Sequence, residues 1–583
     1  MFEPRWRRPL GRMAPERRVG VAGGQARRPR DLDDGTSAVS PEPEIRQGRT
    51  RPNAPHQTRR REDRRMSPSS LRMSELVATL ALGQDNAFGQ PLESQLRSCL
   101  LAVWLSDEAD LGPDTRSTVY WTALLRYVGC TGHAHEVSGL FGDEIVARAR
   151  TLLHDAANPQ EVIGEAIALA TAGHPPDEQE QIRQIIEREA IPWSEHNFAS
   201  GCEVADVLVR RLGFGPDVRD ALRCTFERWN GMGFPAHVSG EDIPLPMRIV
   251  HLTHDMEAIG RLGSFDEALE AAHDRRDRTY DPRLVDLFVA HGEHWFGQLG
   301  KVEPWDATLE LEPSPRRELR GTDLDDALRV VADFVDLKSP FMGGHSRRCA
   351  ALCSRAAAVA GLTDDEATAL VRAALVHDLG STAIPNSIWD KPGPLTRAEF
   401  DRVEIHPMLT EQMLRRSPAL AELTPLAASH HERLDGSGYH RRERASADDV
   451  SSGILAAADV YTAMTSDRAD RPAYSEVQAA AELALLVSGG VLDGRATDAV
   501  LSASGHGSNR SSRRASTRPG GLTKREVEVL RLAARGLTTA AIAEELFISP
   551  KTVDHHVQHV YTKIGVSTRA AAALWAMEHG VVA

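Results

Sequence analysis

The 583-residue chain contains few aromatic residues and no long apolar runs. Aromatic residues make up 5% of the sequence, while the total hydrophobic share of 41% is ample for folded cores. No apolar run reaches the ~18 residues of a membrane-spanning helix, and the N-terminal stretch lacks the apolar segment of a signal peptide. We therefore expect a cytoplasmic protein that does not enter a membrane.

Cysteine is also scarce, and the six cysteines form no Cys-x-x-Cys pair. Cys349 and Cys353 lie one helical turn apart among alanine and leucine. This pattern predicts thiols packed in the core of a protein in a reducing cytosol.

Residues 1–72 are rich in Arg, Pro and Gly and show no apolar periodicity. Segments such as RRPR and RPNAPHQTRRREDRR cannot bury enough apolar surface to fold, so we predict a disordered arm. A basic arm can hold nucleic acid. The alternative, favoured because the segment offers no packing or readout pattern, is an inert tail or an extension upstream of a start at Met66 or Met73.

The stretch from Asp336 to Arg471 carries seven side chains able to bind metal, in five short clusters. Apolar residues at helical spacing surround them, which predicts that all seven lie within helices. Imidazole and carboxylate ligands without cysteine suit Fe, Mn, Zn or Co. Neighbouring residues on a helix point about 100° apart, so one carboxylate of a dyad can bridge two metals in a hydrolytic centre. The seven residues are His345, His377, Asp378, His406, His430, His431 and Asp459.

The motif HHERLDGSGY, preceded by HDLG and KPGPLT and followed by ADVYTAMTSDR, resembles the HD-GYP subgroup of HD-domain metal phosphohydrolases. The resemblance covers residues 319–504, and the ligand clusters occur in the family's order. It implies that the seven residues hold two divalent transition metals, with Fe or Mn favoured, and that His377 and Asp378 are catalytic with Asp378 as the bridge.

Members of this family typically hydrolyse cyclic di-GMP, so the resemblance implies a cyclic dinucleotide or another nucleotide as substrate. Arginine suits the phosphates because its planar fork donates paired hydrogen bonds. The residues implied in substrate binding are Lys391, Tyr439, Arg468 and Arg471.

Three positions depart from the family's pattern. Ser381 stands where HDxGK has a lysine near the scissile phosphate, and His440 replaces the proline of GYP. Phe341 stands where relatives with three metals carry glutamate, which favours a two-metal site. The first two departures support an alternative: a transcription factor whose site binds a nucleotide without turning it over.

Residues 73–300 repeat the organisation of residues 319–504. FERWNGMGFPAHVSGEDIPLPMRIVHLTHDMEAI resembles the same family motif without its ligands. Thr225-Phe226 replace the histidine pair, Asn230 replaces the aspartate of DG, and Arg126-Tyr127 fill the HD position. We predict a duplicated domain that lost its metal site and serves in dimerisation, ligand sensing or regulation. The remaining polar residues of its last motif, expected on a solvated helix face, are His251, His254 and Asp255.

The C-terminal residues 521–583 resemble the LuxR-type helix-turn-helix. Thr523 with Glu526 has the pattern of a capping box, and Ser549 with Pro550 has the pattern that starts a recognition helix. A metal site at His555 and His559 is not favoured, because two ligands are too few. The residues expected to face the major groove of double-stranded DNA are Lys551, Thr552, Asp554, His555 and Gln558.

The sequence thus predicts an all-α protein with two tandem helical HD-type domains and a four-helix LuxR-type module. A proline-containing linker is expected at 301–318 and a flexible basic linker at 505–520. We expect a homodimeric, cytoplasmic regulator that joins a nucleotide phosphodiesterase to DNA binding.

Overall fold

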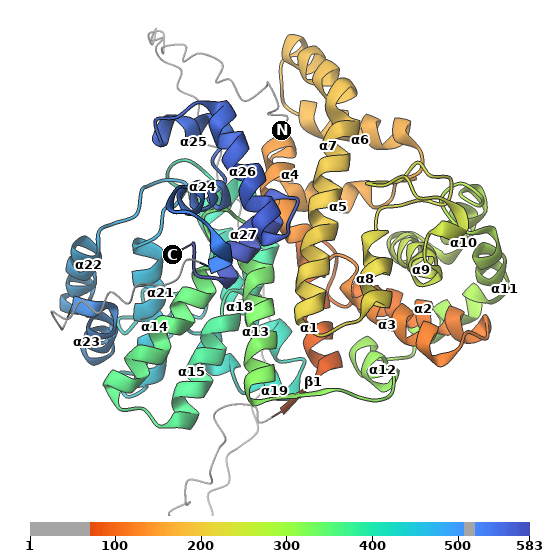
Figure 1. Cartoon of the computed structure of the whole chain (residues 1–583). Coiled ribbons are helices and arrows are strands. Elements are labelled where there is room, and N and C mark those ends of the chain that lie inside the picture. Colours follow the sequence, from red (N-terminus) through yellow and green to blue (C-terminus); the bar gives the residue numbers. More distant parts are fainter. Residues whose placement is uncertain (1–69, 507–518, 583) are drawn as a thin grey trace, which may run out of the picture. The chain divides into compact units, whose positions relative to one another are not determined.

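Helices are the dominant secondary structure of the described chain, residues 70–506 and 519–582 of a computed structural model (Figure 1). Within these ranges the only strands are β1 (Ser70–Arg72) and β2 (Glu318–Arg320), which pair antiparallel with Leu71 opposite Leu319. The all-α prediction is therefore confirmed. The predicted disordered arm lies outside the described residues as far as residue 69. Its last three residues form β1 instead, because Leu71 is buried there.

The first copy of the repeat begins after β1. Proline residues start several of its helices, where their missing N–H costs no hydrogen bond. Its elements are α1 Met73–Ala87, α2 Ser94–Glu108, α3 Pro113–Leu125, η2 Cys130–His133, α4 Ala134–Phe141, α5 Glu144–Thr151, α6 Pro159–Thr171, α7 Pro176–Arg211, α8 Pro216–Arg223, η3 Gly240–Asp242, α9 Leu245–Leu262, α10 Phe265–Asp274 and α11 Pro282–Leu299.

A further helix, α12 (Pro304–Glu310), lies where the sequence predicted only a linker. Pro304 occupies the first turn of this helix rather than breaking one, and Trp305 and Thr308 are buried against the first copy. The segment 301–318 thus contains a helix that the sequence pattern did not predict.

The second copy begins after β2 and packs in the same pattern as the first. Helix α14 lies against α15 and α21, as α2 lies against α3 and α9. Its elements are α13 Gly321–Asp336, α14 His345–Ala360, α15 Asp364–Val376, η4 Leu379–Ala383, α16 Asn386–Trp389, α17 Arg397–Val403, α18 His406–Leu414, α19 Pro418–Ala421, α20 Thr424–Ala427, α21 Val450–Met464, α22 Glu476–Ser488, α23 Gly494–Leu501 and η5 Ser502–His506.

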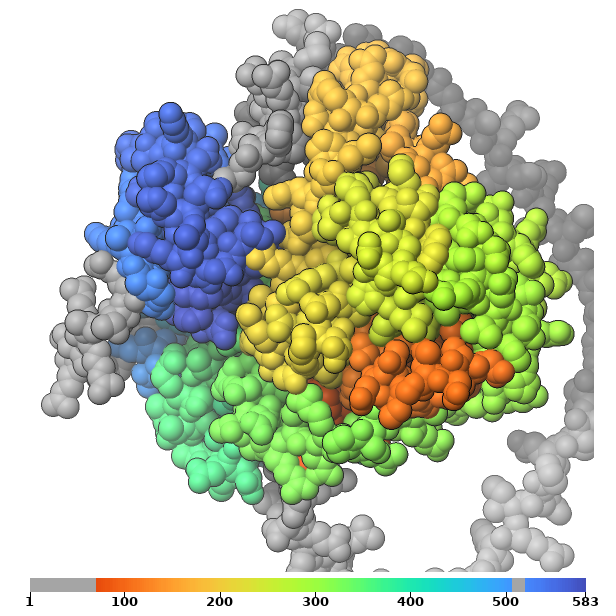
Figure 2. All heavy atoms as spheres, turned by 45° about the vertical axis from the view of Figure 1, so that its right-hand side comes forward, coloured from red at the N-terminus to blue at the C-terminus, as the bar shows by residue number. Residues whose placement is uncertain are grey.

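The two copies share one hydrophobic core. Buried residues of α1 and α2 belong to the same apolar cluster as those of α13, α14 and α15. A methyl group on Gly83 of α1 would lie 3.1 Å from the ring of Phe334 and 3.3 Å from Leu379. The first copy is thus packed into the second rather than tethered to it. Figure 2 shows a face on which segments of the first copy, orange to yellow-green, gather.

In each copy, a glutamate at the matching position of the motif holds the turn after the histidine-pair position. Glu227 accepts the backbone N–H groups of Ala236 and Val238. Glu432, at the matching place in the second copy, accepts the N–H of Arg441. This glutamate fixes the loop whether or not the loop carries metal ligands.

An arginine holds the other side of the same turn. Arg228 donates to the carbonyl of Glu227 at 2.7 Å, and Arg433 donates to the carbonyls of His430 and Glu432, each at 2.9 Å. Because both copies keep these bonds, the first copy retains the backbone shape of the motif without its ligands.

The C-terminal module contains η6 Pro519–Gly521, α24 Lys524–Ala534, α25 Thr539–Glu545, α26 Pro550–Ile564 and α27 Arg569–Glu578. Thr523 and Glu526 form the predicted capping box, and Ser549 caps the recognition helix α26. The four-helix prediction is confirmed. Among the described helices, none has the length and apolar character needed to cross a bilayer. Five of the six cysteines are buried and Cys224 is half-buried.

Candidate metal centre

The seven predicted ligands converge at one place in the second copy, but mostly from the ends of helices. They occupy the first residues of α14 and α18, the residues that follow α15 and α20, and the interior of α21. The prediction that all seven lie within helices is therefore wrong, and only Asp459 lies well inside one. The reason is that helix ends leave backbone carbonyls without helical partners, and these can orient an imidazole.

The ligands form two groups that meet at Asp378. His345, His377 and Asp378 offer ligand atoms within 4.8 Å of one another, and so do His406, His430 and His431. Oδ2 of Asp378 lies 3.4 Å from His377 Nε2, while its Oδ1 lies 3.3 Å from His406 Nε2. One carboxylate thus faces both groups, the geometry of a bridge.

Asp459 closes the centre from α21. Its Oδ1 lies 3.0 Å from Nε2 of His345, and its Oδ2 lies 3.9 Å from Nδ1 of His431. Its Oδ1 also lies 3.9 Å from Nε2 of His377, so Asp459 approaches two histidines of the first group and one of the second.

Three of the imidazoles are held by backbone carbonyls three residues earlier. Nδ1 of His377 lies 2.9 Å from the carbonyl of Ala374, Nδ1 of His406 lies 2.7 Å from that of Val403, and Nδ1 of His430 lies 2.6 Å from that of Ala427. A carbonyl only accepts, so each Nδ1 carries the proton and each Nε2 presents a lone pair to the centre. This arrangement is typical of metal-bound histidine.

The lone pairs give a direct test of whether the residues fit a metal. Nε2 of His406 and Nε2 of His430 face each other at 3.1 Å, and Nε2 of His377 is buried without a hydrogen-bond partner among the described residues. Two acceptor nitrogens repel at that distance unless a cation lies near both. The donor set therefore fits divalent cations.

The environment of the centre favours ionised carboxylates and neutral His345, His430 and His431, whereas Asp378 and Asp459 raise the pKa of His377 against the effect of its burial. Burial lowers the pKa of His430 to about 4. Burial acts against ionisation of Asp378, but the surrounding imidazoles, that of His377 above all, outweigh it, and the pKa of Asp378 lies well below its usual value. The neutral state of His430 and the ionised state of Asp378 are those that metal binding requires.

Residues that sequence reasoning did not single out hold the ligands in place. Thr410 accepts the N–H of Gly380 and donates to the carbonyl of His377, both at 2.9 Å. Asp336 accepts both the hydroxyl and the N–H of Ser346, next to His345. A threonine one helical turn after His406 was the available signal for the first of these contacts.

The predicted substrate residues are placed differently from one another. Tyr439 is half-buried and stacks on His431 with ring centroids 4.4 Å apart. Arg468 is half-buried, and Asp459 and Asp378 lie near enough to oppose the lowering of its pKa by burial. These two residues border the ligands.

The other two predicted substrate residues are engaged elsewhere. Arg471 donates to the carbonyls of Ala463 and Met464 at the end of α21. Lys391 forms a 2.6 Å ion pair with Glu399. The structure does not bring these two cations to the metal ligands.

The positions that depart from the family pattern lie around the centre. The hydroxyl of Ser381 is buried and has no partner among the described residues. Nε2 of His440 lies 3.6 Å from Oε2 of Glu411. Phe341 is half-buried and precedes α14. None of the three adds a ligand.

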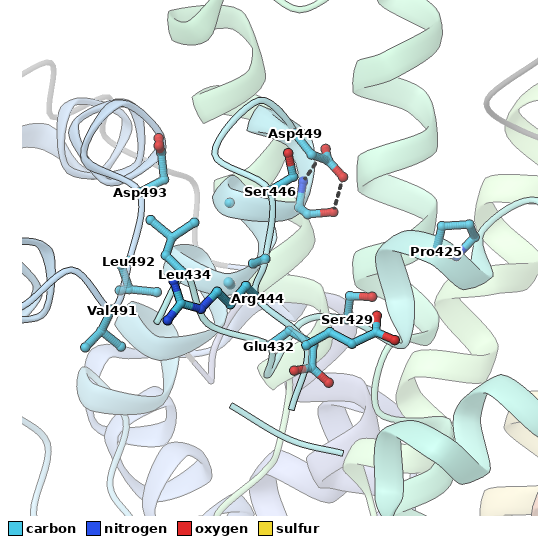
Figure 3. Close-up of a pocket in the computed structure, with 15 residues that line it drawn as sticks. Pro425, Ser429, Glu432, Leu434, Arg444, Ser446, Asp449, Val491, Leu492 and Asp493 are labelled. Atoms are coloured by element: carbon cyan, nitrogen blue, oxygen red, sulfur yellow. Dashed lines mark hydrogen bonds between the residues drawn. The ribbon is translucent and has the colours of Figure 1, made fainter. Parts of the chain in front are cut away.

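A separate pocket with a volume of about 170 Å³ (Figure 3) is lined by Ser429 and Glu432, which flank the histidine pair in the sequence. Ser429, Glu432 and Arg444 line it together with the N-cap residues Asp449 and Asp493. Since it contains none of the seven predicted ligands, it is not the metal centre.

The matching place in the first copy is not a solvated face. His251, His254 and Asp255 are 2%, 6% and 6% exposed, so that prediction is wrong. Helix α9 packs against α2, α3 and α10, which leaves these polar side chains facing the interior. Arg126 lies against Asp255 there, with 3.7 Å between Nη2 and Oδ1.

The recognition helix α26 presents most of its predicted DNA-facing side chains to solvent. Lys551, Thr552, His555 and Gln558 are exposed, whereas Asp554 is half-buried and accepts a hydrogen bond from Thr539. Thr539 thus turns the one acidic residue of this face partly toward α25.

Comparison with known families agrees with this architecture. Residues 329–494 match the HD domain family, and residues 521–576 match the bacterial regulatory proteins of the luxR family. The chain therefore joins an HD domain to a LuxR-family domain.

Particular relatives resemble the HD part. The 3′3′-cGAMP-specific phosphodiesterase 3 of Vibrio cholerae is 27% identical over 70% of this chain and 89% of its own length. A cyclic di-GMP phosphodiesterase of Thermotoga maritima is 35% identical over 25% of this chain and 42% of its own length. A crystal structure of a cyclic GMP-AMP specific phosphodiesterase from V. cholerae is similar at 25% identity, with a TM-score of 0.52, over 74% of this chain and 98% of that one.

Proposed function

We propose that this chain is a metal-dependent phosphodiesterase of cyclic dinucleotides whose HD site acts together with a DNA-binding module in transcriptional regulation. The observation that carries the proposal is Asp378, whose two carboxylate oxygens face separate ligand groups 3.3–3.4 Å away. The relatives named for activity on 3′3′-cGAMP and cyclic di-GMP support the substrate class.

The seven ligands would hold two divalent transition metals, with Fe or Mn favoured by the mixed imidazole and carboxylate set. Bound there, such metals would supply Lewis-acid activation of water and of the phosphodiester. Asp378 and Asp459 keep their negative charge for this role, since the pKa of each lies below its usual value despite burial.

The protein's own side chains would bind and orient the nucleotide. Arg468 would hold a phosphate beside the carboxylates, and Tyr439, stacked on His431, would contact a base. Lys391 and Arg471 stay candidates for outer contacts that require release from their present partners.

A second function is favoured by one observation: no cation stands at position 381, where Ser381 has a buried hydroxyl without a partner among the described residues. On this reading the HD site binds a nucleotide and signals without useful turnover. The two readings differ in turnover but agree in metal content.

A single experiment separates them. The purified chain is analysed for metal and then incubated with cyclic di-GMP and 3′3′-cGAMP, and linear products are quantified. Turnover that disappears with the metals in Asp378→Asn supports the phosphodiesterase. Bound metal and bound nucleotide without product support the sensor, and the absence of both metal and nucleotide binding contradicts both.

The C-terminal module would bind double-stranded DNA as a homodimer on two half-sites, as two-fold helix-turn-helix proteins do. The exposed face of α26 supports this part of the proposal.

A further inference from the structure

The first copy holds two buried arginines at the place that matches the metal centre: Arg126 stands at the position of the ligand His377, and Arg228 matches Arg433, which follows the histidine pair of the second copy. Arg126, in place of His377, is 3% exposed, and Arg228 is 7% exposed. Nη1 of Arg126 donates to the carbonyl of Val250 at 3.2 Å, and Nη1 of Arg228 donates to that of Glu227. The Nε atom of each arginine is buried and has no hydrogen-bond partner among the described residues.

The charges around these arginines do not balance. Asp255 faces Arg126 and accepts a hydrogen bond from Tyr280 at 3.0 Å. The neighbouring His251 and His254 are neutral, because burial lowers the pKa of both. Two guanidiniums therefore share one carboxylate, and a buried charge without a partner is strongly unfavourable.

The nearest other carboxylate does not correct this balance. Glu227 is turned to the loop that follows it, where it accepts the N–H groups of Ala236 and Val238. A purely structural account, in which Arg126 stands in for the lost metal charge beside Asp255 and Arg228 holds the turn as Arg433 does, leaves the buried Nε atom of each arginine without a partner among the described residues.

Aromatic side chains adjoin the arginines. The guanidinium of Arg126 lies 5.0 Å from the centre of the Tyr127 ring, and Tyr127 lies 6.4 Å from Phe226. Phe226 stacks on Phe198 at 4.2 Å, with Phe234 5.9 Å from Phe198. These three phenylalanines are half-buried rather than fully enclosed.

Cationic guanidiniums beside half-buried aromatic rings recognise a specific chemistry. Guanidinium binds phosphate through paired hydrogen bonds, and every nucleobase has a face that stacks on an aromatic ring. We propose that the first copy is a second, metal-independent nucleotide site, in which Arg126 and Arg228 hold a phosphate ester and the Phe198, Phe226 and Phe234 rings contact its base. This site is independent of turnover in the second copy.

The test is calorimetric titration of the full-length chain carrying His377→Ala and Asp378→Ala, with a chelator present, so that the metal centre does not contribute. The probes are GMP, cyclic di-GMP and inorganic phosphate. We expect a guanine nucleotide to bind, at least tenfold weaker binding in Arg126→Met, and little change in the matched control Arg97→Met. Arg97 is a partly buried arginine of the same copy that pairs with Glu257.

Two further variants keep the test decisive if Arg126→Met alone does not fold. Arg126→Met with Asp255→Asn removes the opposed charges together, and Phe226→Leu weakens only the base contact. Loss of nucleotide binding in the first and a nucleotide-specific loss in the second support the site. Unchanged binding in a folded Arg126 variant, equal affinity for phosphate and GMP, or no binding of any probe would overturn it.

Discussion

Lys338 of the second copy and Glu144 of the first form an ion pair that is completely enclosed by protein. The two side chains are 1% and 0% exposed, and Glu144 also accepts the N–H of Asn386 at 2.9 Å. Lys338 lies in the loop that leads to His345. The pair therefore connects the ligand-free copy to the segment that carries the first metal ligand.

Removing one partner of this pair should destabilise the fold strongly. Lys338→Met leaves Glu144 as an uncompensated buried carboxylate, and we expect a loss of about 3–5 kcal/mol in the free energy of unfolding. Urea unfolding checks this, with Arg329→Met as control because the exposed Arg329–Asp326 pair is worth at most about 1 kcal/mol. A Lys338→Met effect no larger than that of the control would contradict the prediction.

The bridging geometry predicts unequal metal losses. Asp378→Asn should remove both of the ~2 metals expected per chain, because Asp378 faces both ligand groups. His431→Ala should remove about one, since the group of His345, His377 and Asp378 stays complete. Elemental analysis of protein loaded with Fe or Mn measures this, with His555→Ala as control. Equal losses from the first two variants would argue against a bridge.

The absence of a cation at position 381 should limit the rate of hydrolysis. Ser381→Lys supplies the missing cation, and one electrostatic contact of this kind is worth on the order of 10²–10³ in rate. We expect faster hydrolysis of a cyclic dinucleotide in Ser381→Lys but not in Ser381→Met, which has a long side chain without charge. Steady-state rates of hydrolysis at saturating metal measure the effect. An equal change of rate in both variants would mean that side-chain packing, and not charge, is responsible.

Stability should fall in mild acid through His133 of the first copy. Burial lowers the pKa of His133 to about 3, next to Arg148. Between pH ~6.5 and ~3 the unfolded chain binds a proton that the folded chain does not, so stability decreases as pH falls, by about 1.4 kcal/mol per pKa unit at most. Urea midpoints at pH 7.5 and 5 should differ less in His133→Gln than in wild type. The exposed His174 provides the control variant His174→Gln, which should leave the difference unchanged.

The module should read DNA through α26. Lys551→Ala should weaken binding to all sequences alike, whereas His555→Ala should change which bases are preferred. Anisotropy at fixed salt with a panel of duplexes measures both effects. Lys524→Ala, on exposed Lys524 of α24, is the control for a general loss of positive charge. Specific binding by a chain lacking residues 519–583 would refute the assignment.

Local pattern was sufficient where a short segment determines its own structure. Thr523 and Ser549 cap helices as predicted, and the spacing of the second-copy motifs identified the side chains that converge on Asp378. Whether those side chains hold metal stays a prediction. Pattern failed where tertiary packing decides: α9 carries polar residues that look solvent-facing, yet other helices cover it.

Two further features had no sequence signal of their own. Taken alone, Pro304 is typical of a linker. The structure shows that it starts α12, where the next residue, Trp305, is buried. Nothing near Lys338 or Glu144 indicates that they meet, because 194 positions separate them.

In both copies, a glutamate and an arginine hold the motif turn through bonds to backbone groups, and these bonds do not involve the side chains of metal ligands. Since Glu227 and Arg228 keep the turn in shape without any ligand, the ligand positions in the first copy were free to change without unfolding it. The same independence makes the first copy a natural host for protein engineering. A histidine pair placed at Thr225 and Phe226 would enter a loop that already has the required backbone, and His-Asp at Arg126 and Tyr127 would follow α3 as His377 and Asp378 follow α15.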